Sequence, residues 1–132
     1  MDDPVTAALE VPLAAALGCA LIDPDSPATG AWLEVGDLAG NGLGGTHASA
    51  LDVLAELAGF LAAVPALGEG EHAVTHAIST QLLGAGRPGQ RVEARGRLVR
   101  RTGRLAFVDV TVTADDVVLA TSQITKSVVR PR

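Results

Sequence analysis

One segment of this chain, residues 47–64, has the period of a long α-helix and is too apolar for a helix on a protein surface. Its apolar residues recur at spacings of three and four, and at about 1.5 Å per residue the helix would be roughly 27 Å long. These residues are Leu51, Val53, Leu54, Leu57, Ala58, Phe60, Leu61 and Val64. Pro65 ends the helix, because the residue before a proline avoids helical geometry. Such a helix must be surrounded by the rest of the chain.

The second half of the chain changes to the alternation of β-strands. Four Val- and Thr-rich segments separated by short turns predict an antiparallel meander over residues 72–83, 91–101, 104–114 and 117–129. Two shorter strands are predicted at 19–23 and 28–35, and a short helix, or two helical turns broken near Pro12, at 5–17. Strands of ten or more residues indicate a large curved sheet. The predicted class is α+β, with a long central helix wrapped by six antiparallel strands.

Length and composition limit the chain further. The 132 residues suit one domain, which we expect to span residues 1–132 and to bury about two-thirds of the surface of the unfolded chain. Two Phe, one Trp and no Tyr imply an aliphatic core, and a single cysteine, Cys19, allows no internal disulfide. The longest apolar run, 57–64, is far shorter than the roughly 20 residues of a membrane span. We therefore expect a cytoplasmic protein without a membrane partner.

The charged residues are divided unevenly along the chain. Residues 1–86 contain eleven acidic and no basic residues, whereas residues 87–132 contain all ten basic residues and only four acidic ones. The net charge of −5 argues against nucleic-acid binding, which depends on clustered Lys and Arg. Seven arginines nevertheless lie between Arg87 and Arg104. This arginine band indicates either a solvated strand face that protects a sheet edge or a binding site for a small polyanion.

The start of the long helix is a candidate binding site. The loop that leads into it, NGLGGTHAS from Asn41, is rich in glycine. The first N–H groups of a helix are free and carry partial positive charge, so an oxygen that becomes negative during a reaction can bind there. His47 at this point is more often a local structural group than a base.

Glu56 interrupts the apolar helix and is a second candidate. It shares one stripe of the helix with Ser49 and Asp52, which indicates either a solvated edge with a capping-box start or a carboxylate held in a site. His72 and His76 lie on one face of a predicted strand without a third ligand nearby, so no metal is predicted. No cofactor is expected.

The order of these residues is similar to that of a known family. Asn41, His47 and Glu56 are separated by five and eight residues, and they precede VTHAISTQLLGAGRPGQRVEARGRLVRRTGRLAFVDVTVT and a final TSQITKSVV. From about residue 11 to the C-terminus, the chain resembles the hotdog-fold acyl-CoA thioesterases of the phenylacetyl-CoA thioesterase type. The resemblance implies a hotdog fold, an acyl-CoA or aroyl-CoA substrate, and hydrolysis to a free acid and CoA.

The resemblance also implies roles for particular residues. Glu56 takes the place of the catalytic carboxylate, Asn41 that of the residue that holds the thioester or the water, and Thr75 that of a hydroxyl that orients the water. His47 corresponds to the histidine of a His-Gly-Gly run, whose first glycine position donates a backbone N–H to the oxyanion. Ala48 and Ser49 replace these glycines, so Ala48 can supply the N–H but puts a methyl group where the thioester approaches.

The spacing of Ala48 and Glu56 has a consequence for assembly. Eight residues correspond to about 12 Å along one helix, whereas reacting atoms must come within roughly 3 to 3.5 Å of each other. If both act on one carbonyl, they belong to different chains, so we expect an obligate homodimer with two shared sites, or a dimer of such dimers. Glu56 would be either the base that activates water or a nucleophile.

A CoA thioester would give the arginine band a partner. Its phosphates would lie on exposed arginines, for which we select Arg87, Arg101 and Arg104. Two other functions remain open at this point. One is a non-catalytic acyl-CoA-binding module on the same fold, and the weaker one is a hydratase, whose spacing of His and acid differs from the spacing here.

Overall fold

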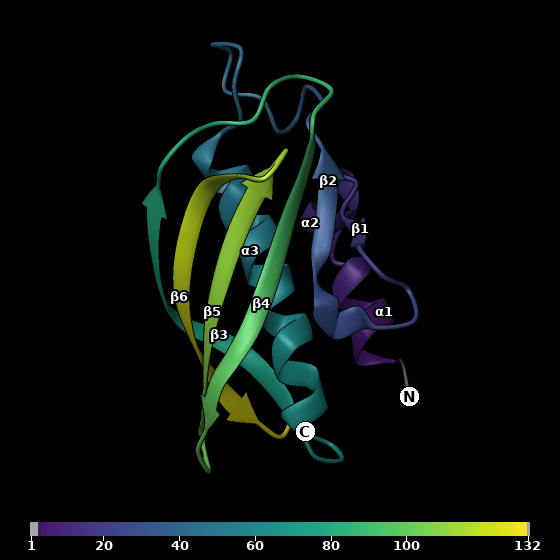
Figure 1. The fold of residues 1–132 in the computed structure, drawn as a ribbon. Coiled ribbons are helices and arrows are strands. Elements are labelled where there is room, and N and C mark those ends of the chain that lie inside the picture. Colours follow the sequence, from purple (N-terminus) through teal and green to yellow (C-terminus); the bar gives the residue numbers. More distant parts are fainter. Residues whose placement is uncertain (1–2, 132) are drawn as a thin grey trace.

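A long helix packs against one face of a curved six-stranded sheet in the computed structural model, which describes residues 3–131 (Figure 1). The helices are α1 (Pro4–Leu9), α2 (Pro12–Ala16) and α3 (Ala48–Ala63), with short 3-10 helices at η1 (Pro27–Thr29) and η2 (Val64–Ala66). The strands are β1 (Ala20–Leu21), β2 (Ala31–Glu34), β3 (His72–Leu82), β4 (Arg91–Arg101), β5 (Leu105–Ala114) and β6 (Val117–Val129). The predicted α+β class with a wrapped central helix is confirmed.

The six strands are all antiparallel to their neighbours, in the order β1-β2-β4-β5-β6-β3. The meander predicted over four strands holds for β4-β5-β6 only: β6 returns to pair with β3, which is one edge of the sheet and is not a neighbour of β4. The connection from Leu82 to Arg91 is longer than the two to five residues of a hairpin loop. Irregularities in register occur in β3 between Thr75 and Ala77, in β4 between Leu98 and Arg100, and in β6 between Val118 and Ala120, opposite Val112 and Thr113 of β5. Such bulges bend a strand and increase its twist, which lets the sheet curve around α3.

Helix α3 is the centre of the core. Most of its side chains are buried, and they pack on the inner sides of β2, β4, β5 and β6. The helix and β4 come unusually close at Gly96, where an added Cβ would lie 2.7 Å from the carbonyl oxygen of Ala58. The segment Ala48–Ala66 is apolar and long enough to cross a membrane, but 61% of its apolar window is buried in the fold. It is therefore the core helix of this domain.

The N-terminal part differs from the predicted strands. Pro12 begins α2, and the break expected there separates two short helices. The strand predicted at 19–23 is only Ala20–Leu21, and the first residues of the segment 28–35 belong to η1. The physical reason is Pro27, which starts the 3-10 turn, together with Gly30, whose φ of 133° is open to glycine alone. The extended strand β2 begins only at Ala31.

Candidate active site

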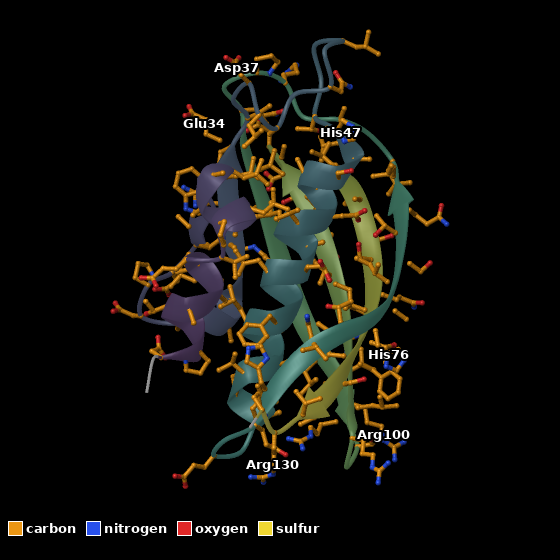
Figure 2. All side chains as sticks on the ribbon, turned by 180° about the vertical axis from the view of Figure 1, so that it is seen from behind. Glu34, Asp37, His47, His76, Arg100 and Arg130 are labelled. Carbon is orange, nitrogen blue, oxygen red and sulfur yellow. The ribbon has the colours of Figure 1, made fainter. Side chains whose placement is uncertain are left out.

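A cavity of about 520 Å³ lies between the two N-terminal helices, the middle of α3 and the start of β3. Figure 2 looks onto this side of the molecule, with the start of β3 crossing the lower part of α3. Most of the wall is apolar. Its polar side chains are those of Glu56, His72, Thr75 and Lys126. Two of the residues predicted for catalysis, Glu56 and Thr75, are therefore brought together, one from α3 and one from β3.

The stripe of α3 that carries Glu56 faces the strands β3 and β6. One turn before Glu56, Asp52 Oδ1 accepts a hydrogen bond of 2.8 Å from Thr80 Oγ1 of β3. Thr80 Oγ1 in turn lies 2.9 Å from the Oγ of buried Ser122 of β6. Asp52 and Glu56 are both half-buried. Of the two sequence interpretations, the solvated edge does not describe Asp52, because its partner comes from the sheet.

Lys126 is the polar residue of this cavity that the sequence analysis missed. The residue is 3% exposed, and Nζ donates a hydrogen bond of 2.9 Å to Thr75 Oγ1, from the position directly opposite in the β3-β6 pair. Its stem passes α3 at Gly59, where a Cβ would lie 3.8 Å from Lys126 Cε. Burial lowers the pKa of Lys126, and the negative charge of Glu56 partly opposes this. The sequence does contain a signal that could have revealed Lys126. It is a lysine in the last strand at a position that faces inward, between apolar residues that face the same way.

The hydrogen bond from Lys126 determines that the Thr75 hydroxyl oxygen is an acceptor in this pair. An ammonium group can only donate, so Thr75 Oγ1 is the acceptor in the pair with Lys126. The Thr75 proton is then available for another acceptor in the cavity. Its role in orienting water stays a prediction.

The start of α3 has one backbone N–H without a partner. His47 is the N-cap: its Nδ1 accepts from the N–H of Ser49 at 3.0 Å, and its carbonyl oxygen accepts from Ala50 and Leu51. Within residues 3–131, the N–H of Ala48 donates to no acceptor. Figure 2 shows His47 at the end of α3. His47 thus caps the helix, and the N–H of Ala48 is left for an incoming group.

Asn41 holds the loop that precedes this helix start. Its Oδ1 accepts from the N–H groups of Leu43 and Gly45 at 2.7 and 3.1 Å, and its own N–H donates to the Gly45 carbonyl oxygen. These three bonds fold residues 41–45 into a compact turn. The predicted contact of Asn41 with a thioester or water stays a prediction.

One chain does not bring the two halves of the predicted site together. Asn41, His47 and Ala48 are absent from the lining of the cavity that contains Glu56. Along α3, the eight residues from Ala48 to Glu56 correspond to about 12 Å. A carbonyl at Glu56 is therefore out of reach of the Ala48 N–H of the same chain.

Of the three arginines selected for CoA, Arg87 lies far from Arg101 and Arg104, which lie at the turn between β4 and β5. Arg87 precedes β4 and Arg104 follows it, so the ten steps from Arg91 to Arg101, at about 3.3 Å each, keep them roughly 33 Å apart. Arg101 forms a two-bond ion pair with Glu71, with nitrogen–oxygen distances of 2.9 and 3.0 Å, and also bonds the carbonyl oxygen of Ala66. This contact lowers the pKa of Glu71 to about 2. In this structure the Arg101 guanidinium ties β4 to the segment after α3.

The rest of the arginine band lies on the outer face of the sheet. Arg91 and Arg95 both pair with Glu93, at 3.0 and 3.4 Å, and Arg97 pairs with Asp109 at 3.1 Å. Arg91 also stacks over the Trp32 ring, 4.0 Å from its centre. Four of the seven arginines, Arg101 included, thus have carboxylate partners on β4 itself, on β5 or on the segment after α3. This arrangement favours the interpretation of the arginine band as a solvated strand face over its interpretation as a single binding site for a polyanion.

The two histidines of β3 turn to different partners. The His72 ring lies 5.1 Å from the Phe60 ring, centre to centre, at the cavity. His76 Nδ1 lies 2.7 Å from Ser127 Oγ on β6. Among residues 3–131, no group of three or more His, Cys, Asp or Glu side chains has an arrangement suited to a metal ion.

A central helix wrapped by a curved antiparallel sheet, with a carboxylate in the middle of that helix, defines a protein of the hotdog-fold class. The family model described as Thioesterase superfamily matches residues 43–121, and the chain belongs to that superfamily. No curated protein sequence matches the chain. The resemblance seen in the sequence is confirmed at the level of family and fold.

Solved structures of the same fold are numerous. A thioesterase of Haemophilus influenzae is 20% identical, with a TM-score of 0.83, over 98% of this chain and 93% of that one. The PaaI protein from the phenylacetic acid degradation operon of E. coli is 20% identical, with a TM-score of 0.81, over 94% and 88%. A Streptococcus mutans protein bound to acetyl-CoA is 28% identical, with a TM-score of 0.69, over 77% and 81%.

Proposed function

We propose that this protein hydrolyses acyl-CoA thioesters to a free acid and CoA, with Glu56 as the catalytic carboxylate. The observation that carries the proposal is the position of Glu56, half-buried in the wall of a largely apolar cavity of about 520 Å³. A cavity of this size and lining suits an acyl group. Membership of the thioesterase superfamily and the fold shared with the acetyl-CoA-bound Streptococcus mutans protein support this choice of substrate.

Two courses of the reaction use Glu56. In the first, the carboxylate takes a proton from a water whose oxygen attacks the thioester carbonyl carbon. In the second, the carboxylate attacks this carbon itself, and water then hydrolyses the mixed anhydride. In both, the C–S bond breaks and CoA leaves as a thiolate that takes up a proton. Thr75, whose hydroxyl proton is not used by Lys126, is the group we assign to orienting the water.

The oxyanion would be held by the N–H of Ala48 from a second protomer. This N–H has no acceptor within residues 3–131, and it lies at the positive end of the α3 dipole. A donor of this kind contributes about 2.7 to 4 kcal/mol to lowering the barrier of acyl transfer. Because Ala48 and Glu56 of one chain are about 12 Å apart along the helix, the site needs both chains.

The edge strand β3 is the surface we propose for the dimer. It is 11 residues long, pairs with β6 on one side only, and exposes Val74, Ile78 and Leu82 at 46%, 40% and 52%. An open strand of this length with apolar side chains is a template for pairing with another chain. Antiparallel pairing of two β3 strands about a two-fold axis reverses the partner helix, which turns its Ala48 end toward Glu56.

Among the arginines, we propose Arg87 as the contact for CoA phosphates. Gly86, its neighbour, donates its N–H to Thr46 Oγ1 at 3.0 Å, so the loop with Arg87 is tied to the loop before Ala48. A thioester held at Ala48 would thus have CoA near an exposed guanidinium. Arg101 is engaged by Glu71, and Arg104 lies at the opposite end of β4.

The test is release of CoA from a panel of acyl-CoA and aroyl-CoA esters. We expect the wild type to hydrolyse at least one ester, and Glu56→Ala and Glu56→Gln to lose most of the rate while remaining dimers by light scattering. Glu34→Gln, which removes an exposed carboxylate on β2, is the matched control and should retain full rate.

Two results would contradict the proposal. A wild type that binds acyl-CoA but releases no CoA would be a binding module, for which the Ala48 methyl group at the helix start supplies a physical reason. Full activity in a monomer would exclude the shared site, because no single chain brings Glu56 and the Ala48 N–H to one carbonyl.

A further inference from the structure

The cavity beside Glu56 contains a buried cation that hydrolysis as proposed does not require. Lys126 is 3% exposed, and its ammonium group lies at the cavity wall, 5.8 Å from the centre of the Phe60 ring. The ammonium group can reach this wall because Gly59 of α3 has no side chain and leaves space for the aliphatic part of Lys126. A buried lysine is costly to keep unless its charge and its donors have partners.

The donors of Lys126 are only partly used. An ammonium group has three N–H bonds, and within residues 3–131 the acceptor in hydrogen-bond range of Nζ is Thr75 Oγ1. The carboxylate of Glu56 acts on Lys126 through its charge but is not within the 4.0 Å of an ion pair. Two N–H bonds therefore remain for an acceptor that is not part of this chain.

An acyl group made of carbon alone would leave these donors without partners. It would displace water from around Lys126 and surround the ammonium with Phe60, Val74 and other apolar wall residues. Sites with a polar group that the ligand must satisfy discriminate strongly against ligands that lack the matching atom. An acyl group with an oxygen at this position would supply the missing acceptor.

We propose that Lys126 is a specificity residue that donates hydrogen bonds to a neutral oxygen on the acyl group, such as a keto, hydroxyl or ether oxygen. This inference rests on the proposed function, because it takes the cavity to be the acyl site. The oxygen is neutral because Glu56 already supplies the negative charge that faces Lys126. A carboxylate on the acyl group would bring a second anion close to Glu56, and like charges in one site repel each other.

Binding of CoA thioethers tests this without any hydrolysis. We choose S-hexyl-CoA, its counterpart with a keto oxygen on the third carbon of the chain, and its counterpart with a terminal carboxylate, measured by calorimetry on the wild type. We expect the keto ligand to bind about 10- to 100-fold more tightly than S-hexyl-CoA, which is the range for a hydrogen bond with a charged donor. The carboxylate ligand should bind more weakly than the keto ligand.

Lys126→Met keeps most of the side-chain length and removes the donors. In this variant the preference for the keto ligand should disappear, whereas Leu13→Ala, at the apolar wall, should weaken all three ligands alike and keep the preference. Equal binding of the keto and plain ligands by the wild type overturns the inference even if Lys126→Met does not fold. An unchanged preference in a folded Lys126→Met does the same, and so does a preference for the carboxylate ligand.

The outcome is separable from that of the hydrolysis assay. Binding with the expected preference but no CoA release would reject the catalytic proposal and keep the role of Lys126. CoA release without any preference would reject the role of Lys126 and keep the catalytic proposal.

Discussion

The contact between α3 and β4 at Gly96 gives a prediction that can be worked out from distances. A Cβ added at Gly96 would lie 2.7 Å from the carbonyl oxygen of Ala58 and 2.9 Å from the Cβ of Ala62. Ordinary contacts begin at 3.4 Å, so Gly96→Ala must move the helix and the strand apart by about 0.7 Å. The first neighbour is backbone, which cannot turn away. Overpacking of this kind costs about 1 to 3 kcal/mol in the free energy of unfolding.

The same displacement reaches the site, because Ala58 is two residues from Glu56 on α3. A misplacement of 1 Å costs up to about 100-fold in rate, so we expect a loss on the order of tenfold in CoA release. Unfolding in urea and the hydrolysis assay measure the two effects. The control is Gly103→Ala, because nothing lies within 4 Å of a Cβ there. A Gly96→Ala protein as stable as the Gly103→Ala protein would refute the close packing of α3 on β4.

Two further predictions concern the ion pair of Glu71 and the edge strand. The hydrogen bonds from Arg101 lower the pKa of Glu71 to about 2 from 4.5, so its contribution to stability is complete above pH 4.5 and is lost as the pH falls toward 2. Urea unfolding should show Glu71→Gln to be less stable than the wild type at pH 7 but equal to it near pH 2, and a constant difference would contradict this. If β3 pairs two chains as proposed, Ile78→Asp should give a monomer that releases no CoA, whereas Thr111→Asp on the outer face of β5 should leave the proposed dimer and its activity unchanged. A dimeric, active Ile78→Asp protein would show that β3 is not the interface.

Several parts of the fold could be predicted because their causes are local. The period of the apolar residues in 47–64 predicts α3, and the alternation of Val and Thr in the second half predicts β3 to β6. Pro12 separates two short helices because a proline lacks the N–H that a continuing helix needs. The error at 28–35 has a local cause too, since Pro27 and Gly30 favour a turn before the strand.

The candidate site was predicted less completely. The position of Glu56 on α3 followed from helical spacing, and the family resemblance selected it from the two interpretations of its stripe. The arginine band looked continuous because its residues are close in sequence. Along an extended strand the same residues spread over roughly 33 Å and take separate partners: Arg91 and Arg95 pair with Glu93 of the same strand, and Arg97 pairs with Asp109 of β5.

The sequence by itself determined the long helix and the four long strands, which side of α3 is apolar, and which carboxylate interrupts it, because each depends on neighbours within a few residues. Only the tertiary structure decided that Lys126 meets Thr75 across 51 residues of sequence, and that Arg101 is held by Glu71 across 30. The face of a strand on which a side chain lies, and the groups it then meets, depend on strand order and register. These are set by the packing of the whole sheet around α3, to which every strand contributes at once.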